Sequence, residues 1–143
     1  MKRDMTTLVM QTKDLTTFRT SSAARSASIA VTTRAGEERV PIARLGEAGA
    51  ESELAGWVRG DGDVAVAGAY RFLHGSDCGV YAVGTAPAWR RRGLARSLVE
   101  HVLADAAHRG ARTASLQSTP MGQPLYASLG FEPVGRYEDW VPE

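Results

Sequence analysis

An arginine- and glycine-rich stretch between a predicted strand and a predicted helix carries the residue types in this sequence that are best suited to chemistry. It reads Val83-Gly-Thr-Ala-Pro-Ala-Trp-Arg-Arg-Arg-Gly-Leu-Ala-Arg-Ser-Leu98. A helix that begins at Gly93 points unpaired N–H groups and the positive end of its dipole into the turn, where a phosphate group binds well. Gly93 has no Cβ and Ala95 has only a methyl group, so a ligand can approach the backbone closely. Positive charge is supplied by Arg91, Arg92 and Arg96.

Two common phosphate motifs do not fit this turn. The P-loop needs a Lys-Ser or Lys-Thr pair after its second glycine, but Gly93 is followed by Leu94 and Ala95. The dinucleotide fingerprint needs three spaced glycines, and only one is present here. A nucleic-acid patch is an alternative, although Trp89 is the only aromatic residue among the arginines and the helix that follows has a mixed-charge outer face. The position at a strand-to-helix junction favours phosphate binding.

The pattern that is left, Arg90-x-x-Gly93-x-Ala95 after an apolar strand, resembles the acyl-CoA-binding motif of the GNAT superfamily of N-acetyltransferases. Downstream, Pro124-Leu-Tyr-Ala-Ser-Leu-Gly-Phe131 resembles the second signature of the superfamily, a short helix that carries a tyrosine and closes on Gly-Phe. The two signatures occur in the expected order, and the resemblance covers about residues 54 to 140.

This resemblance implies a mixed, mostly antiparallel central sheet flanked by helices, with an abbreviated N-terminal part. It also implies direct transfer of an acetyl group from acetyl-CoA to a primary amine in a ternary complex, without a metal or a covalent enzyme intermediate. Backbone N–H groups from Arg91 through Arg96 would contact the pyrophosphate, and the strand would pair with the pantetheine amides. The implied cofactor-binding residues are Val83, Gly84, Thr85, Arg91, Arg92, Gly93, Leu94, Ala95 and Arg96.

Tyr126 is the candidate catalytic residue, because it matches the tyrosine of the second signature. A phenol has a pKa of about 10, above the value of about 8.5 for a thiol. It is therefore protonated at neutral pH and can donate a proton to the departing sulfur. The alternative is that its ring packs on the core beside Leu125 and Leu129. The general base is left open: the nearby candidates are usually solvated surface residues, namely Glu51, Glu53, His74, Asp77 and Tyr81.

The composition agrees with one compact domain. A chain of 143 residues with 43% hydrophobic content can bury a core without disulfides or metals, and a net charge of +1 does not call for nucleic acid or an anionic membrane. Cys78 is the only cysteine and is expected to be a buried strand residue, and no Cys/His spacing indicates a metal site. No apolar run approaches the roughly 20 residues that a membrane helix needs, so the expected location is the cytoplasm.

The remaining patterns predict an α/β fold with a mixed sheet, because strands are followed by a strand-helix-strand crossover. Strands are expected at 54–58, 64–70, 78–83, 113–117 and 134–141, with a hairpin turn at 59–63. Apolar residues at helical spacing predict a helix from 94 that ends before Gly110, with His101 and His108 at its surface or half-buried. A short helix is expected at 123–129.

Residues 1–38 are predicted to be a flexible or weakly structured arm, followed by a GNAT-like acetyltransferase domain at 39–143. A short edge strand or helix fragment is expected at 27–31, and a short helix at 47–55. Because little regular structure is expected before residue 54, either the N-terminal part of the domain is abbreviated or another chain completes it.

A non-catalytic acyl-CoA-binding sensor or subunit is therefore kept as an alternative function. A nucleotide- or nucleic-acid-binding module is a second alternative. The acceptor is expected to be a small-molecule or peptide amine. The final strand, with Tyr137 and Trp140, is a candidate for pairing in a homodimer.

Overall fold

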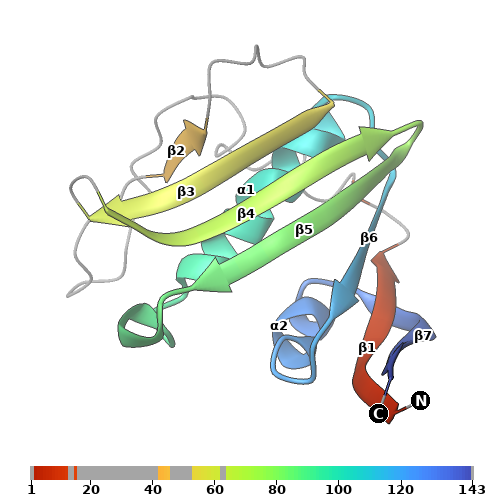
Figure 1. Ribbon diagram of the computed structural model, residues 1–143. Helices are drawn as coiled ribbons and strands as arrows, with labels where there is room; N and C mark the ends of the chain where they lie inside the picture. Colours follow the sequence, from red (N-terminus) through yellow and green to blue (C-terminus); the bar gives the residue numbers. More distant parts are fainter. Residues whose placement is uncertain (1, 13–14, 16–41, 46–52, 62–63, 143) are drawn as a thin grey trace.

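The computed structural model describes residues 2–12, 15, 42–45, 53–61 and 64–142. Seven strands and two α-helices are formed by these residues (Figure 1). In chain order they are β1 (Lys2–Thr12), β2 (Ile42–Leu45), β3 (Leu54–Asp61), β4 (Val64–His74), β5 (Asp77–Thr85), α1 (Leu94–His108), β6 (Thr113–Ser118), α2 (Gln123–Ser128) and β7 (Glu132–Val141). A short 3₁₀ helix, Pro87–Trp89, lies between β5 and α1.

The strands form one sheet in the order β2-β3-β4-β5-β6-β1-β7. Among these seven described strands, only β5 and β6 are parallel neighbours, and every other adjacent pair is antiparallel. The parallel pair is the one joined through α1, as expected when a helix provides the crossover. The mixed, mostly antiparallel sheet predicted from the sequence is therefore confirmed.

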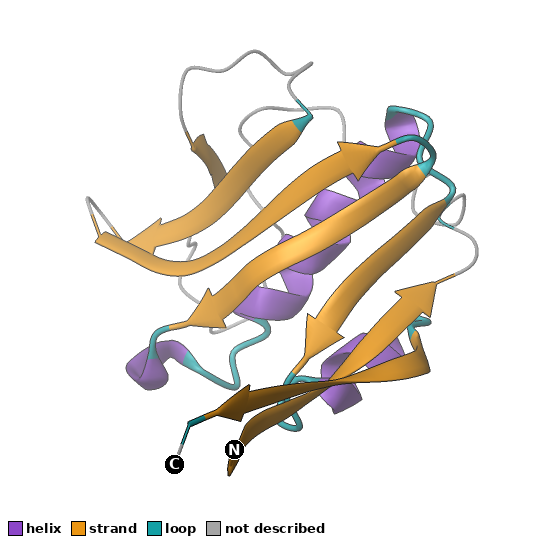
Figure 2. Cartoon of the chain, turned by 45° about the vertical axis from the view of Figure 1, so that its right-hand side comes forward, coloured by secondary structure: helices purple, strands orange, loops and turns teal. Residues whose placement is uncertain are grey.

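Helix α1 lies across one face of β3, β4 and β5 (Figure 2). Its apolar residues recur every three or four positions, and Leu98, Val99, Val102 and Leu103 are fully buried against the sheet. The helix ends as predicted, because Gly110 follows it with a φ of 95°, which glycine adopts without strain. No helix in the described part of the chain is long and apolar enough to cross a membrane.

Cys78 is fully buried in β5, as predicted. Burial raises the pKa of its thiol to about 12, so the thiolate needed for nucleophilic chemistry does not form at neutral pH. The expectation for His101 is wrong, because this side chain is buried and meets the Trp57 ring edge-to-face at 5.5 Å. A tryptophan on the facing strand gives the imidazole apolar cover that helical spacing alone does not reveal.

Residues 2–12 differ from the expected flexible arm, because they form β1 between β6 and β7. Leu8 lies opposite Ser118 on one side and Arg136 on the other. The sequence carries little local sign of this strand, since its order comes from pairing with strands more than 100 residues away. Residues 16–38, including the fragment predicted at 27–31, lie outside the described residues. Of the helix predicted at 47–55, residues 54 and 55 instead begin β3.

Candidate functional site

Strands β5 and β6 separate after a short paired segment. They are paired in register only from Asp77–Thr113 to Gly79–Ser115, and Figure 2 shows them diverging toward their carboxyl ends. Asp77 links the two strands at their paired ends, because the hydroxyl groups of Thr113 and Ser115 each donate to its carboxylate over 2.7 Å. Among the described residues, the second half of β5 therefore has no strand neighbour on the β6 side. Such an edge can accept an extended ligand as an added strand.

A β-bulge lies in β5 at the point where it leaves β6. The register against β4 passes from Tyr70–Tyr81 to Gly68–Gly84, so β5 contains an extra residue, and Ala82 has a φ of 51°. Bulges re-aim a strand and are frequent beside active sites. Val83, Gly84 and Thr85, which were predicted to bind a cofactor, follow this bulge on the diverging part of the strand.

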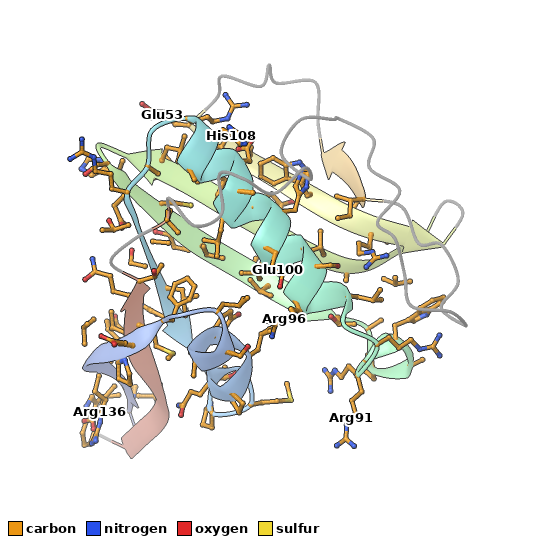
Figure 3. The ribbon with its side chains drawn as sticks, turned by 180° about the vertical axis from the view of Figure 1, so that it is seen from behind. Glu53, Arg91, Arg96, Glu100, His108 and Arg136 are labelled. Carbon is orange, nitrogen blue, oxygen red and sulfur yellow. The ribbon has the colours of Figure 1, made fainter. Side chains whose placement is uncertain are left out.

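Two arginines shape the turn that follows β5. Arg90 Nε donates to the Thr85 carbonyl oxygen over 3.2 Å, and Arg92 lies over the Trp89 ring at 4.7 Å from its centroid. Arg91 has a φ of 63° and an exposed side chain without a hydrogen bond or ion pair to any residue that the structure describes. Figure 3 shows it pointing away from the ribbon. A non-glycine residue in the left-handed region costs about 1 kcal/mol or more, and such strain clusters at ligand-binding sites.

The N-terminus of α1 has no cap from the part of the chain that the structure describes. Gly93 is its N-cap with a φ of 76°, no described side chain caps the helix, and the first turn holds no acidic residue. The Ser97 N–H donates to the Gly93 carbonyl oxygen over 3.1 Å, so the N–H groups of residues 94–96 precede the helical hydrogen bonds. A Cβ built on Gly93 would meet no atom within 4 Å. The geometry suits an anion.

The guanidinium of Arg96 serves the protein itself. Its Nε pairs with Glu100 Oε1 at 3.0 Å, and both residues are labelled on α1 in Figure 3. Its Nη1 donates to Ser128 Oγ over 2.7 Å. These contacts join the first turn of α1 to the end of α2. Arg96 can therefore offer a ligand its backbone N–H while its side chain stays engaged.

Tyr126 lies in α2 and is 8% exposed. Its ring meets Phe131 edge-to-face at 5.9 Å and lies so close to Gly122 that an added Cβ would approach it to 2.9 Å. The ring of Tyr126 is thus packed in the core, as the alternative to a catalytic role expects. It does not exclude proton donation, because burial raises the pKa of Tyr126 and keeps the phenol protonated.

The candidate bases are not brought together by the structure. Glu53, His74 and Tyr81 are exposed, Asp77 is engaged by two hydroxyl groups, and Glu51 lies outside the described residues. The described residues also contain no cluster of His, Cys, Asp and Glu that would hold a metal ion.

An aromatic surface beside the bulge was missed from the sequence. Arg71 of β4 pairs with Asp105 of α1 at 2.8 Å, so Tyr70 and Phe72, its neighbours in the strand, lie on the opposite face of the sheet. Tyr70 and Phe72 are each 37% exposed, and Tyr81 in β5 is 56% exposed. Tyr70 and Phe72, two residues apart in β4, could have indicated this surface, because a solvated strand face does not need two large aromatic side chains.

Comparison with known proteins agrees with this geometry. The family model of the acetyltransferase (GNAT) domain matches residues 50–133. A putative GNAT acetyltransferase from Novosphingobium aromaticivorans is 20% identical with a TM-score of 0.61, over 96% of this chain and 64% of that one. A GCN5-related N-acetyltransferase from Ralstonia eutropha is 29% identical with a TM-score of 0.56, over 62% of this chain and 65% of that one.

A further structure, a predicted acetyltransferase from Clostridium acetobutylicum with acetyl-CoA, is 19% identical with a TM-score of 0.56, over 64% of both chains. The chain thus spans less than two thirds of each of these proteins. No curated protein matches it. The matched domain covers more than half of the chain, and the chain belongs to the GNAT acetyltransferase family.

Proposed function

We propose that the protein is an N-acetyltransferase that moves an acetyl group from acetyl-CoA to a primary amine by direct transfer in a ternary complex. The observation that carries this proposal is the separation of β5 from β6 beside the open N-terminus of α1. A strand edge and an anion site next to each other suit a ligand with an amide-containing arm and a pyrophosphate. The acetyl-CoA in the Clostridium acetobutylicum relative supports the choice of donor.

The proposed cofactor contacts come mainly from the backbone. The N–H groups of residues 91–96 donate to the pyrophosphate, and Arg91 and Arg92 add positive charge from exposed positions. Residues 83–85 pair with the pantetheine amides along the diverging part of β5. Acetyl-CoA supplies the activated thioester, so the protein has to position it and stabilise the charges that form.

The proposed reaction forms a C–N bond and breaks a C–S bond. The amine loses a proton and attacks the thioester carbon, while an N–H of β5 donates to the thioester oxygen as negative charge develops there. Tyr126 then donates its proton to the departing thiolate. The amine can release its proton through water, because many acceptors need no dedicated protein base.

The acceptor is proposed to be a small-molecule or peptide amine that docks on the aromatic surface of Tyr70, Phe72 and Tyr81. Tyr81 directly precedes the bulge at Ala82, so this surface adjoins the strand segment assigned to the thioester. Aromatic rings attract ammonium groups and bury apolar carbon, and both interactions suit an amine before it loses its proton.

The test is thermal unfolding with saturating acetyl-CoA, with ATP as the control. A ligand at a hundred times its Kd stabilises by about 2.7 kcal/mol, a shift of about 5–10 °C for a chain of this size. A positive shift is followed by an amine screen that detects the free thiol of CoA. No shift with folded protein contradicts the proposal, and a shift with ATP or DNA alone supports the nucleotide- or nucleic-acid-binding alternative. A shift without thiol release from any amine favours the non-catalytic acyl-CoA-binding alternative.

A further inference from the structure

The aromatic surface of Tyr70, Phe72 and Tyr81 extends across three strands. Tyr70 of β4 lies directly opposite Tyr81 of β5. Phe72 of β4 lies directly opposite Leu54 of β3, which is 55% exposed. Residues that face each other in a sheet point to the same side, so Leu54 belongs to this surface as well. In Figure 1 this side of β3, β4 and β5 is turned toward the viewer, with α1 behind the strands.

Two glycines let the tyrosine rings of this surface lie along the sheet. Gly56 of β3 faces Tyr70, and a Cβ built on it would come within 2.6 Å of Tyr70 Cε1. Gly79 is on the same side of β5 as Tyr81, and a Cβ there would come within 2.6 Å of Tyr81 Cε2. Side chains do not approach each other so closely, so neither ring could keep its position over an alanine. The glycines thus make both rings part of a broad, low surface.

The aromatic surface carries little charge. It is formed by three strand segments, 54–58, 68–74 and 77–81. Asp77 is the only carboxylate in these segments, and its oxygens accept hydrogen bonds from Thr113 and Ser115 over 2.7 Å. Arg71 is buried on the opposite face, where it pairs with Asp105. A ligand on the aromatic surface therefore meets rings, and the one carboxylate of these segments already accepts two hydrogen bonds.

We propose that the aromatic surface selects an arylalkylamine, a primary amine with one positive charge on a short chain that ends in an aromatic ring. This inference rests on the proposed function and names the class of its acceptor. The acceptor ring packs on Tyr70 and Tyr81, because aromatic pairs gain more than their buried area alone provides. Tyr81 directly precedes the bulge at Ala82, so the short chain brings the amine to the strand segment assigned to the thioester. Polyamines are disfavoured, because their further ammonium groups would lose water without gaining a carboxylate partner.

The experiment is calorimetric titration of the full chain with 2-phenylethylamine, n-butylamine and spermidine, with and without saturating CoA. 2-Phenylethylamine is expected to bind about tenfold more tightly than n-butylamine, because only the former carries a ring, and spermidine is expected to gain nothing from its additional charges. Binding is measured without turnover, and release of the CoA thiol from acetyl-CoA is followed separately. The expected preference without thiol release contradicts the proposed function and supports the amine site. Thiol release without that preference overturns only the present inference.

Variants of Tyr81 and Gly79 test whether the ring over the glycine carries the preference for 2-phenylethylamine. Tyr81→Ala should reduce this preference to about threefold or less, whereas Tyr81→Phe keeps the ring and should retain it. Gly79→Ala should reduce it as well, and should add little in the Tyr81→Ala background, because its methyl group acts by displacing that ring. Gly135→Ala in β7 is the matched control, since a Cβ there would lie 3.9 Å from Val9 Cβ, an ordinary contact.

The inference is overturned if the parent binds 2-phenylethylamine no more tightly than n-butylamine, or if spermidine binds most tightly of the three amines. It is also overturned if folded Tyr81→Ala keeps the full preference for 2-phenylethylamine. Circular dichroism checks the fold of each variant, and the Tyr81 variants decide alone if Gly79→Ala does not fold.

Discussion

Arg96 and Ser128 join the two helices of the candidate site, because Arg96 Nη1 donates to Ser128 Oγ over 2.7 Å. Arg96 lies in the first turn of α1, and Ser128 is the last residue of α2, the helix that carries Tyr126. The N-terminus of α1, which is proposed to bind the pyrophosphate, is thus joined to the helix that carries the candidate proton donor.

Removing the hydrogen bond between Arg96 and Ser128 is expected to weaken the attachment of α2 to α1. Ser128→Ala should lower the free energy of unfolding by about 0.5–1 kcal/mol, which lowers the Tm by about 1–4 °C. Glu100→Gln removes the other partner of Arg96, an exposed pair within α1, and should change stability by less than about 0.5 kcal/mol. Differential scanning calorimetry measures both, and equal effects would contradict a special role for the contact between the helices.

Gly93→Ala is expected to weaken acetyl-CoA binding by about tenfold or more. The methyl group would enter the open space above the N-terminus of α1, and the φ of 76° disfavours any side chain there. Gly110→Ala is the matched control, because Gly110 has a φ of 95° and equally open space at the other end of the same helix. Both variants should lose about 1 kcal/mol of stability. Calorimetric titration should show weakened binding only for the Gly93 variant, and equal affinities would remove Gly93 from the site.

Tyr126→Phe is expected to lower turnover by about 10²-fold or more while the Kd for acetyl-CoA changes little, because the ring stays and only the proton donor is lost. Tyr137→Phe, at an exposed position on β7, is the control and should turn over normally. Burial raises the pKa of Tyr126 above its ordinary value of about 10, so the parent should not lose activity through phenol ionisation below that pH. Unchanged turnover in the Phe variant would assign Tyr126 to packing alone.

His101 is expected to make stability fall as the solution becomes acidic. Burial lowers the pKa of this imidazole, an effect that nearby Asp105 partly opposes, and the structure gives its Nδ1 no hydrogen-bond partner among the described residues. The unfolded chain therefore binds a proton at higher pH than the folded chain. Stability contributed by the neutral imidazole is present above about pH 6.5 and is lost as the pH falls through the lowered folded value.

His101→Phe should flatten this dependence, since a phenyl ring can keep the edge-to-face contact with Trp57 and cannot take up a proton. His108→Gln, at the exposed end of α1, should leave it unchanged. Urea unfolding from pH 7.5 to 5 measures the slope. If the parent and His101→Phe respond to pH alike, another group is responsible.

The sequence by itself determined the local parts of the site. A glycine before an apolar-periodic run predicts the start of α1, and the spacing around Tyr126 predicts α2, because both depend on residues within a few positions of each other. The family could be identified from the same two segments, and the matching domain model confirms it.

Only the tertiary structure decided what distant segments do together. Strand β1 is ordered by its pairing with β6 and β7. Asp77 in β5 is linked to β6 by a hydrogen bond from Thr113. His101 is buried because the Trp57 ring packs against it. Because α1 covers one face of the sheet, Tyr70 and Tyr81 on the opposite face stay exposed. Each outcome depends on strand register and on which face a helix covers. These are contacts between residues far apart in the chain, and local propensity does not encode them.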